Sequence, residues 1–91
     1  MSMLHITTQA HIPMAVRYLP KTETRLKAMV EFYDRRYMHT NYGQFIGRYY
    51  LETLLERNIV GLCLDGGVPS WSLSAHDFAQ VHAWLKEVSQ S

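Results

Sequence analysis

The sequence predicts an α+β domain, a small and mainly antiparallel sheet with helices packed on one of its faces. Apolar residues alternate with polar ones near the start of the chain and in a hairpin toward its end, which is typical of half-buried strands. Two central segments and the last one instead follow the 3.6-residue period of a helix. The 91 residues are too few for two cores. We therefore expect one domain over residues 1–91, in the order ββααββα, with a frayed tail at 89–91.

Two strands are expected at the start of the chain. In 3–8, Leu4 and Ile6 alternate with polar neighbours, and 14–19 repeats this alternation. A proline lies just outside each end of the second strand, where the missing N–H costs no ladder hydrogen bond. The two strands are expected to pair as a loose hairpin.

Two helices are expected in the centre of the chain. The first covers 22–38, with Thr22 as N-cap and an apolar face that repeats every three or four residues. The second covers 41–58 and has one narrow polar stripe, so nearly its whole circumference is apolar or aromatic. Such a helix has to be covered on most sides, which predicts a central element or an oligomer interface.

A second hairpin and a final helix are expected at the end of the chain. Strands at 59–64 and 68–73 flank Asp65-Gly66-Gly67, a sequence suited to a tight turn. Ser74 and Asp77 have the spacing of a capping box. The apolar face of the helix that follows comprises Phe78, Val81, Leu85 and Val88.

Composition excludes several classes of protein. A single cysteine forms no internal disulfide, and no apolar run reaches the roughly 18 residues of a membrane span. We expect a cytoplasmic protein.

The net charge of +1 argues against a strongly basic nucleic-acid binder, but it hides an asymmetry in how charge is distributed along the chain. Residues 17–57 carry eight Lys and Arg against five Asp and Glu. The middle of the chain is therefore at +3 and the remainder at −2.

The sequence shows no arrangement that predicts catalysis. Cys63 lies between two leucines in an expected strand, where a cysteine is usually a small hydrophobic residue. His76 and His82 are six residues apart on a helix and so cannot share a metal ion. We expect no catalytic residue, no metal and no cofactor.

A basic stripe on the helix expected at 22–38 is the best candidate for binding. Helical spacing gathers its Lys and Arg residues on one side, where they would meet phosphates or an acidic protein surface. The alternative is a solvated helix face. Six Tyr and two Trp exceed what one small core buries, so some are expected on a recognition surface. The partner-binding candidates are Lys21, Arg25, Arg35, Arg36, Tyr42 and Trp71.

Gly43 and Gly47 mark a second candidate surface, on the helix expected at 41–58. Two glycines destabilise a helix by roughly 2 kcal/mol relative to alanine, so their presence indicates close approach of another element. Together with Tyr50 and Leu54 they would form either an internal packing face or the interface of a homodimer. We expect internal packing.

The segment 18–28, YLPKTETRLKA, resembles part of several short phage and plasmid proteins that have no assigned activity. The resemblance covers about an eighth of the chain and transfers no functional residue. It implies a compact protein that binds and blocks a host component, as anti-CRISPR proteins do. The leading expectation is a non-enzymatic inhibitor of a host defence or nucleic-acid-processing protein. Direct DNA or RNA binding and a homodimeric accessory protein are the alternatives.

Overall fold

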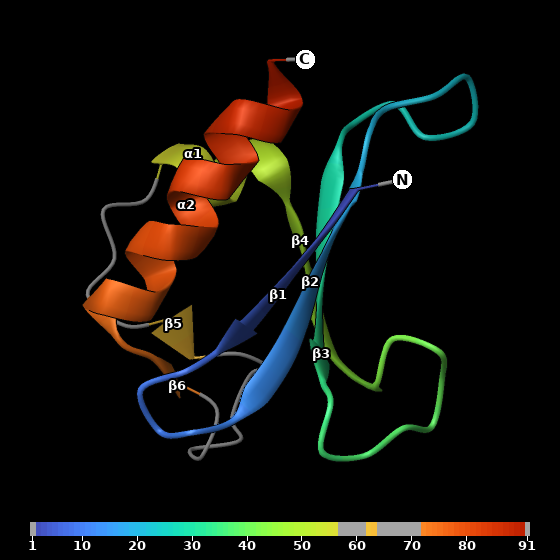
Figure 1. Cartoon of the computed structure of the whole chain (residues 1–91). Coiled ribbons are helices and arrows are strands. Elements are labelled where there is room, and N and C mark those ends of the chain that lie inside the picture. The colour runs from blue at the N-terminus through green and yellow to red at the C-terminus, as the bar shows by residue number, and fades with distance from the viewer. Residues whose placement is uncertain (1, 57–61, 64–71, 91) are drawn as a thin grey trace.

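The chain forms an α+β domain in the computed structural model, which describes residues 2–56, 62–63 and 72–90 (Figure 1). The described elements begin with four strands, continue with a short helix and two short strands, and end with a long helix. In chain order they are β1 (Ser2–Thr7), β2 (Pro13–Leu19), β3 (Met29–Asp34), β4 (Gln44–Tyr50), α1 (Leu51–Glu56), β5 (Leu62–Cys63), β6 (Ser72–Leu73) and α2 (Ala75–Ser89).

The first four strands form an antiparallel sheet in the order β1-β2-β3-β4. Each strand pairs with the next along the chain, so Val16 in the second strand lies between Leu4 and Phe32. Helix α2 lies against one face of this sheet (Figure 1). We call that face the inner face, and the opposite one the outer face.

The hydrophobic core lies between the inner face and the helices. Phe32 and Leu85 are fully buried in it, and the ring of Tyr49 packs edge-on against Phe32 at 5.8 Å between centroids. Burying each large apolar side chain contributes roughly 1.5–3 kcal/mol. The buried members of this core are Met14, Val16, Val30, Phe32, Ile46, Leu54, Leu73, Phe78, Val81 and Leu85.

The expected cap at the start of the last helix is confirmed, with Ser74 as its N-cap residue. The Ser74 hydroxyl accepts a hydrogen bond from the Asp77 backbone N–H at 3.1 Å and donates one to the Asp77 carboxylate at 3.0 Å. That carboxylate also accepts the backbone N–H of Gln9 at 3.1 Å. The cap therefore ties α2 to the loop between β1 and β2, and the helix continues to Ser89.

Part of the expected second hairpin is described. Strands β5 and β6 pair antiparallel, Leu62 with Leu73 and Cys63 with Ser72. The expected turn at 65–67 and the binding candidate Trp71 lie outside the described residues.

The prediction of a helix at 22–38 is wrong, because residues 29–34 form the strand β3. Every residue from Val30 to Asp34 is buried, so both faces of this strand are covered. A strand covered on both faces loses the polar alternation by which strands are recognised, and its apolar residues then fit a helical period by coincidence. Thr22 does bond locally, since its hydroxyl accepts the Arg25 backbone N–H at 3.0 Å, but it closes a turn.

The helix expected at 41–58 is wrong over its first part, where Gln44–Tyr50 forms β4. The register shifts opposite Phe32 and Tyr33, where Phe32 pairs with Gly47 and Tyr33 with Phe45. Ile46 is the extra residue of this bulge and is buried, so the period-2 pattern is broken in mid-strand. Among the described residues of this segment, 41–56, only Leu51–Glu56 is helical, and the described elements run in the order ββββαββα rather than ββααββα.

Candidate functional site

The outer face carries a row of charged residues across three strands. The register places Arg17 of β2 beside Glu31 of β3, and Glu31 beside Arg48 of β4. Residues paired in this way lie on one face of a sheet. This face is opposite the one that packs on α2, so the charges do not enter the hydrophobic core.

The carboxylate of Glu31 is buried between two arginines. Its side chain is only 5% exposed, and its oxygens accept hydrogen bonds from Arg17 at 3.2 Å, from Arg48 at 2.7 and 2.9 Å, and from the Tyr33 hydroxyl at 2.8 Å. Burial raises the pKa of the Glu31 carboxyl, but the hydrogen bonds from Tyr33, Arg48 and Arg17 outweigh it and the pKa lies below its ordinary value. The cluster of two arginines and one carboxylate keeps a net charge of +1.

Aromatic rings surround this cluster. Tyr33 lies 5.3 Å from Tyr42 and 5.8 Å from Phe45, measured between ring centroids. The guanidinium of Arg17 lies 4.7 Å from the centre of the Tyr42 ring, and that of Arg48 lies 5.7 Å from the centre of Phe45. These are cation–π distances, and they add to the ion pairs in fixing the arginine side chains.

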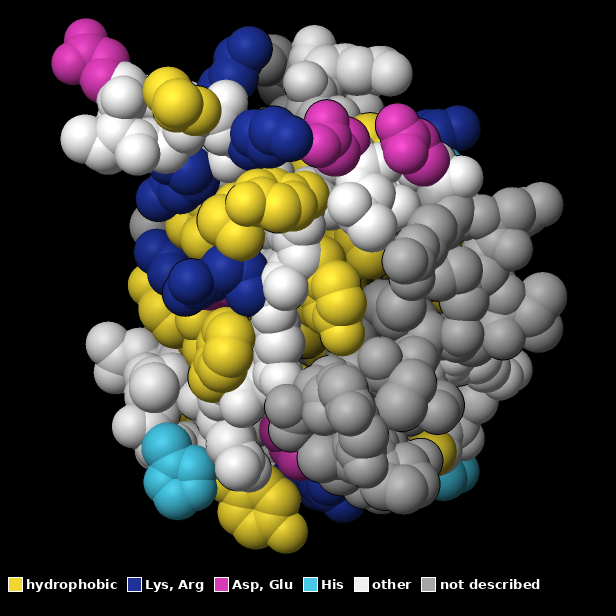
Figure 2. Space-filling view, turned by 180° about the vertical axis from the view of Figure 1, so that it is seen from behind, with side chains coloured by type: hydrophobic (Ala, Val, Ile, Leu, Met, Phe, Trp, Pro, Cys, Tyr) yellow, Lys and Arg dark blue, Asp and Glu magenta, His cyan; other side chains and the backbone are white. Residues whose placement is uncertain are grey.

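Three exposed residues of β4 lie on the outer face, and we call them the β4 row: Phe45, Arg48 and Tyr50. Phe45 is 48% exposed, Tyr50 is 47% exposed and the Arg48 side chain is 53% exposed. They pair with Tyr33, Glu31 and Met29, which are successive outer-face positions of β3. Figure 2 shows the resulting surface, on which Lys and Arg side chains alternate with hydrophobic ones.

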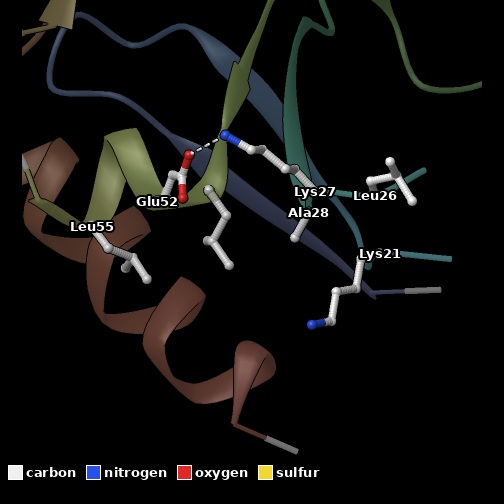
Figure 3. A pocket seen from close by; sticks show the side chains of 7 residues that line it. Lys21, Leu26, Lys27, Ala28, Glu52 and Leu55 are labelled. Atoms are coloured by element: carbon white, nitrogen blue, oxygen red, sulfur yellow. Dashed lines mark hydrogen bonds and ion pairs between the residues drawn. The ribbon is translucent and has the colours of Figure 1, made fainter.

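A pocket of about 280 Å³ adjoins the Tyr50 end of the β4 row. Its rim carries Lys27, whose amine lies 5.3 Å from the centre of the Tyr50 ring and donates to Glu52 at 3.0 Å. Lys21 stands across the pocket from this ion pair (Figure 3). The remaining lining is apolar and consists of Leu26, Ala28, Leu51 and Leu55.

The basic stripe expected on a helix at 22–38 is not formed. Lys21 and Arg25 lie in the loop before β3, whereas Arg35 and Arg36 follow it, at the other end of a strand about 20 Å long. Arg25 donates to the Pro20 carbonyl at 2.6 Å, and Arg35 to the Tyr42 carbonyl at 3.0 Å. The carboxylate that pairs with Arg36, at 2.9 Å, belongs to buried Asp34. A role for these residues in binding a partner stays a prediction.

The glycine face expected on a helix at 41–58 is also not formed. Leu54 is buried in the core from α1, whereas Tyr50 points to the outer face. Gly43 has a φ of +125°, and a Cβ there would lie 2.6 Å from the Asp34 carbonyl oxygen. Its close approach is therefore made within the chain, to the backbone of β3, while Gly47 pairs with Phe32 at the bulge. A homodimer stays a prediction, but the glycine face is not available as its interface.

The described residues show no grouping of three or more His, Cys, Asp or Glu side chains that would hold a metal ion. The buried acids have structural partners: Glu31 and Asp34 pair with arginines, and the Asp77 carboxylate accepts hydrogen bonds from Ser74 and Gln9. None of the helices in the described ranges is long and apolar enough to cross a membrane. Comparison with protein-family models, with curated proteins and with solved structures gives no match for this chain.

Sequence reasoning missed five residues of the outer face, namely Arg17, Glu31, Tyr33, Phe45 and Arg48. Arg17 could be predicted, because the alternation in 14–19 already places its side chain on the face of the sheet opposite that of Val16. The other four require 29–34 and 44–50 to be recognised as strands. The signal for that was the concentration of β-branched and aromatic residues, together with Gly47 in the interior of an expected helix.

Proposed function

We propose that this chain is a non-enzymatic binding protein that recognises a macromolecule through the outer face of its sheet. The observation that carries this is the β4 row, in which a half-exposed guanidinium is fixed on a buried carboxylate and flanked by two half-exposed rings. Arg, Tyr and other aromatic residues are the side chains that dominate binding surfaces. A guanidinium already held in place loses less conformational entropy when a partner arrives.

The expected absence of catalysis stays part of the proposal and is supported by the partners of the buried acids. Glu31 and Asp34 pair with arginines, and the Asp77 carboxylate accepts hydrogen bonds from Ser74 and Gln9, so each of these buried acids has a structural partner. The expected target, a host defence or nucleic-acid-processing protein, rests on the sequence resemblance alone and stays a prediction.

The test compares what is captured by the wild type and by two variants. A tagged chain is crosslinked in cells, and bound proteins and nucleic acids are identified by mass spectrometry and sequencing. The double variant Arg48→Glu with Tyr50→Ala alters the outer face, and Lys86→Glu on the exposed side of α2 is the matched control. We expect a bound species that falls at least tenfold with the double variant and is retained by the control. Equal capture by all three proteins would refute the outer face as the binding surface.

A further inference from the structure

We infer that the ligand of the outer face is a single-stranded nucleic acid, bound along the β4 row with its bases against the rings and its phosphates toward the lysines of the adjoining pocket. This inference rests on the proposed function, since it names the ligand class of the same surface. It is carried by three independent features of the described residues: the spacing of the row, the form of its apolar surface and the distribution of charge.

The spacing of the β4 row is regular despite the bulge. Phe45, Arg48 and Tyr50 pair with positions 33, 31 and 29 of β3, so each step along the row corresponds to two residues of a strand. Two residues span about 7 Å, or about twice the 3.4 Å by which successive bases rise in a stacked strand. One base of an extended strand therefore fits against each of the two rings, and the guanidinium of Arg48 between them meets a phosphate.

The apolar part of this surface consists of rings rather than aliphatic side chains. Phe45 and Tyr50 each leave about half of their surface exposed, and each has a cation within 6 Å of its ring centre, Arg48 for the first and Lys27 for the second. The core of a protein interface is enriched in Arg and aromatic residues but depleted in Lys. The lysine beside Tyr50 is therefore the part of this surface that favours a chain of planar bases joined by phosphates.

The charge of the chain is segregated between the two sides of the domain. Residues 13–50, which comprise β2, β3 and β4 with their connecting loops, carry seven Lys and Arg against three Asp and Glu, a balance of +4. Helix α2 carries Asp77, Lys86 and Glu87, a balance of −1. A polyanion is therefore drawn to the sheet side and repelled from the helix side.

The pocket gives the strand a place to continue beyond Tyr50. Lys21 and Lys27 stand on opposite sides of it, and Leu51 and Leu55 provide an apolar wall (Figure 3). With Arg48 this makes three cations along one track. Releasing counterions from three phosphate contacts on a single strand predicts a slope of about −2 for log K against log salt concentration. Lys27 and Arg48 also pair with carboxylates, but their side chains are more than half exposed, whereas those of Arg17 and Arg36 are 20% and 42% exposed and are left out of the count.

The test uses a fluorescein-labelled 15-mer of deoxythymidine, with binding followed by fluorescence anisotropy from 50 to 300 mM NaCl. We expect saturable binding with a slope of about −2, and weaker binding to a 15-base-pair duplex, whose bases are already stacked. Tyr50→Ala is expected to weaken binding at least about fivefold, because each base–ring stack is worth roughly that or more, whereas Tyr50→Phe keeps the ring and the affinity. Lys21→Ala is expected to reduce the slope by about 0.7, and Lys86→Ala is expected to leave it unchanged.

Three results would overturn the inference: no binding at 50 mM NaCl, equal binding of the duplex, or an affinity that Tyr50→Ala does not change. The proposed function is tested separately. If the oligonucleotide does not bind but the outer-face double variant still loses a captured protein, the ligand class is wrong and the binding surface is right. If neither depends on the outer face, both are wrong.

Discussion

The two faces of one four-stranded sheet differ in what they bury. The inner face packs Val16, Val30 and Phe32 against α2, and all three are fully buried. The outer face buries a carboxylate between two arginines, and the Arg48 side chain stays half exposed whereas that of Arg17 is one-fifth exposed. Hydrophobic burial stabilises the first arrangement, whereas in the second the attraction between charges is largely offset by the cost of desolvating them.

This difference separates stability from recognition within a single strand. Tyr49 and Tyr50 are adjacent in β4, yet Tyr49 packs against the core and Tyr50 lies on the outer face. A polar cluster that contributes little net stability still fixes where its side chains lie. The inner face therefore sets the fold, and the outer face positions the groups that we propose for binding.

The largest expected effect is on the inner face. Phe32→Ala removes a fully buried ring and is expected to lower the free energy of unfolding by about 3–5 kcal/mol. Denaturant titration followed by circular dichroism measures this change, with Phe45→Ala as the outer-face control, expected to cost about 1 kcal/mol. Equal losses in the two variants would contradict the division between the faces.

An intermediate effect is expected from the buried carboxylate. Glu31→Gln is expected to cost about 2 kcal/mol at pH 7, less than the 3–5 kcal/mol of a fully buried pair, because Arg48 reaches solvent. The pKa of Glu31 lies below its ordinary value of 4.5 in the folded chain. Its contribution is therefore complete above about pH 4.5 and is lost as the pH falls through the folded pKa.

The control for this variant is Glu52→Gln, which breaks the exposed ion pair with Lys27. Exposed pairs of that kind contribute little to stability, because solvent screens the attraction between the charges. Unfolding measured between pH 3 and pH 7 is expected to show the gap between wild type and Glu31→Gln closing toward acid, and hardly any gap for Glu52→Gln. A gap for Glu31→Gln that stays constant with pH would contradict the role given to its ionised form.

The smallest expected effect on stability is at Tyr50. Tyr50→Ala is expected to change the free energy of unfolding by less than about 1 kcal/mol, because half of the side chain is already exposed. Tyr49→Ala, one residue earlier, is expected to cost more than twice as much, since it removes the edge-on contact with Phe32. Thermal unfolding of the pair measures both, and a reversed order would contradict the assignment of the two faces.

The sequence predicted the ends of the fold better than its centre. The last helix carries its own start signal in Ser74 and Asp77, and the first two strands alternate cleanly, so local pattern was sufficient there. Strand β3 is buried on both faces and β4 contains a bulge, and both features depend on neighbouring strands that no local window contains.

The candidate site was harder to predict for the same reason. Arg17, Glu31 and Arg48 are 14 and 17 residues apart along the chain and meet only through the register of three strands. The expected basic stripe depended on helical spacing. It is not formed, because this segment folds as a loop and a strand instead of a helix. Tyr42 is an expected partner-binding aromatic that the structure brings to the outer face, and Tyr50, which was expected in the glycine face, lies there as well.

The most direct measurement is an NMR titration of the ¹⁵N-labelled chain with the deoxythymidine 15-mer. If the outer face binds a single strand, the largest amide shifts will fall on residues 44–50 and on Lys27, with those of α2 nearly unmoved. Shifts confined to residues 75–89 would contradict the choice of face, and a spectrum that does not change would contradict the ligand.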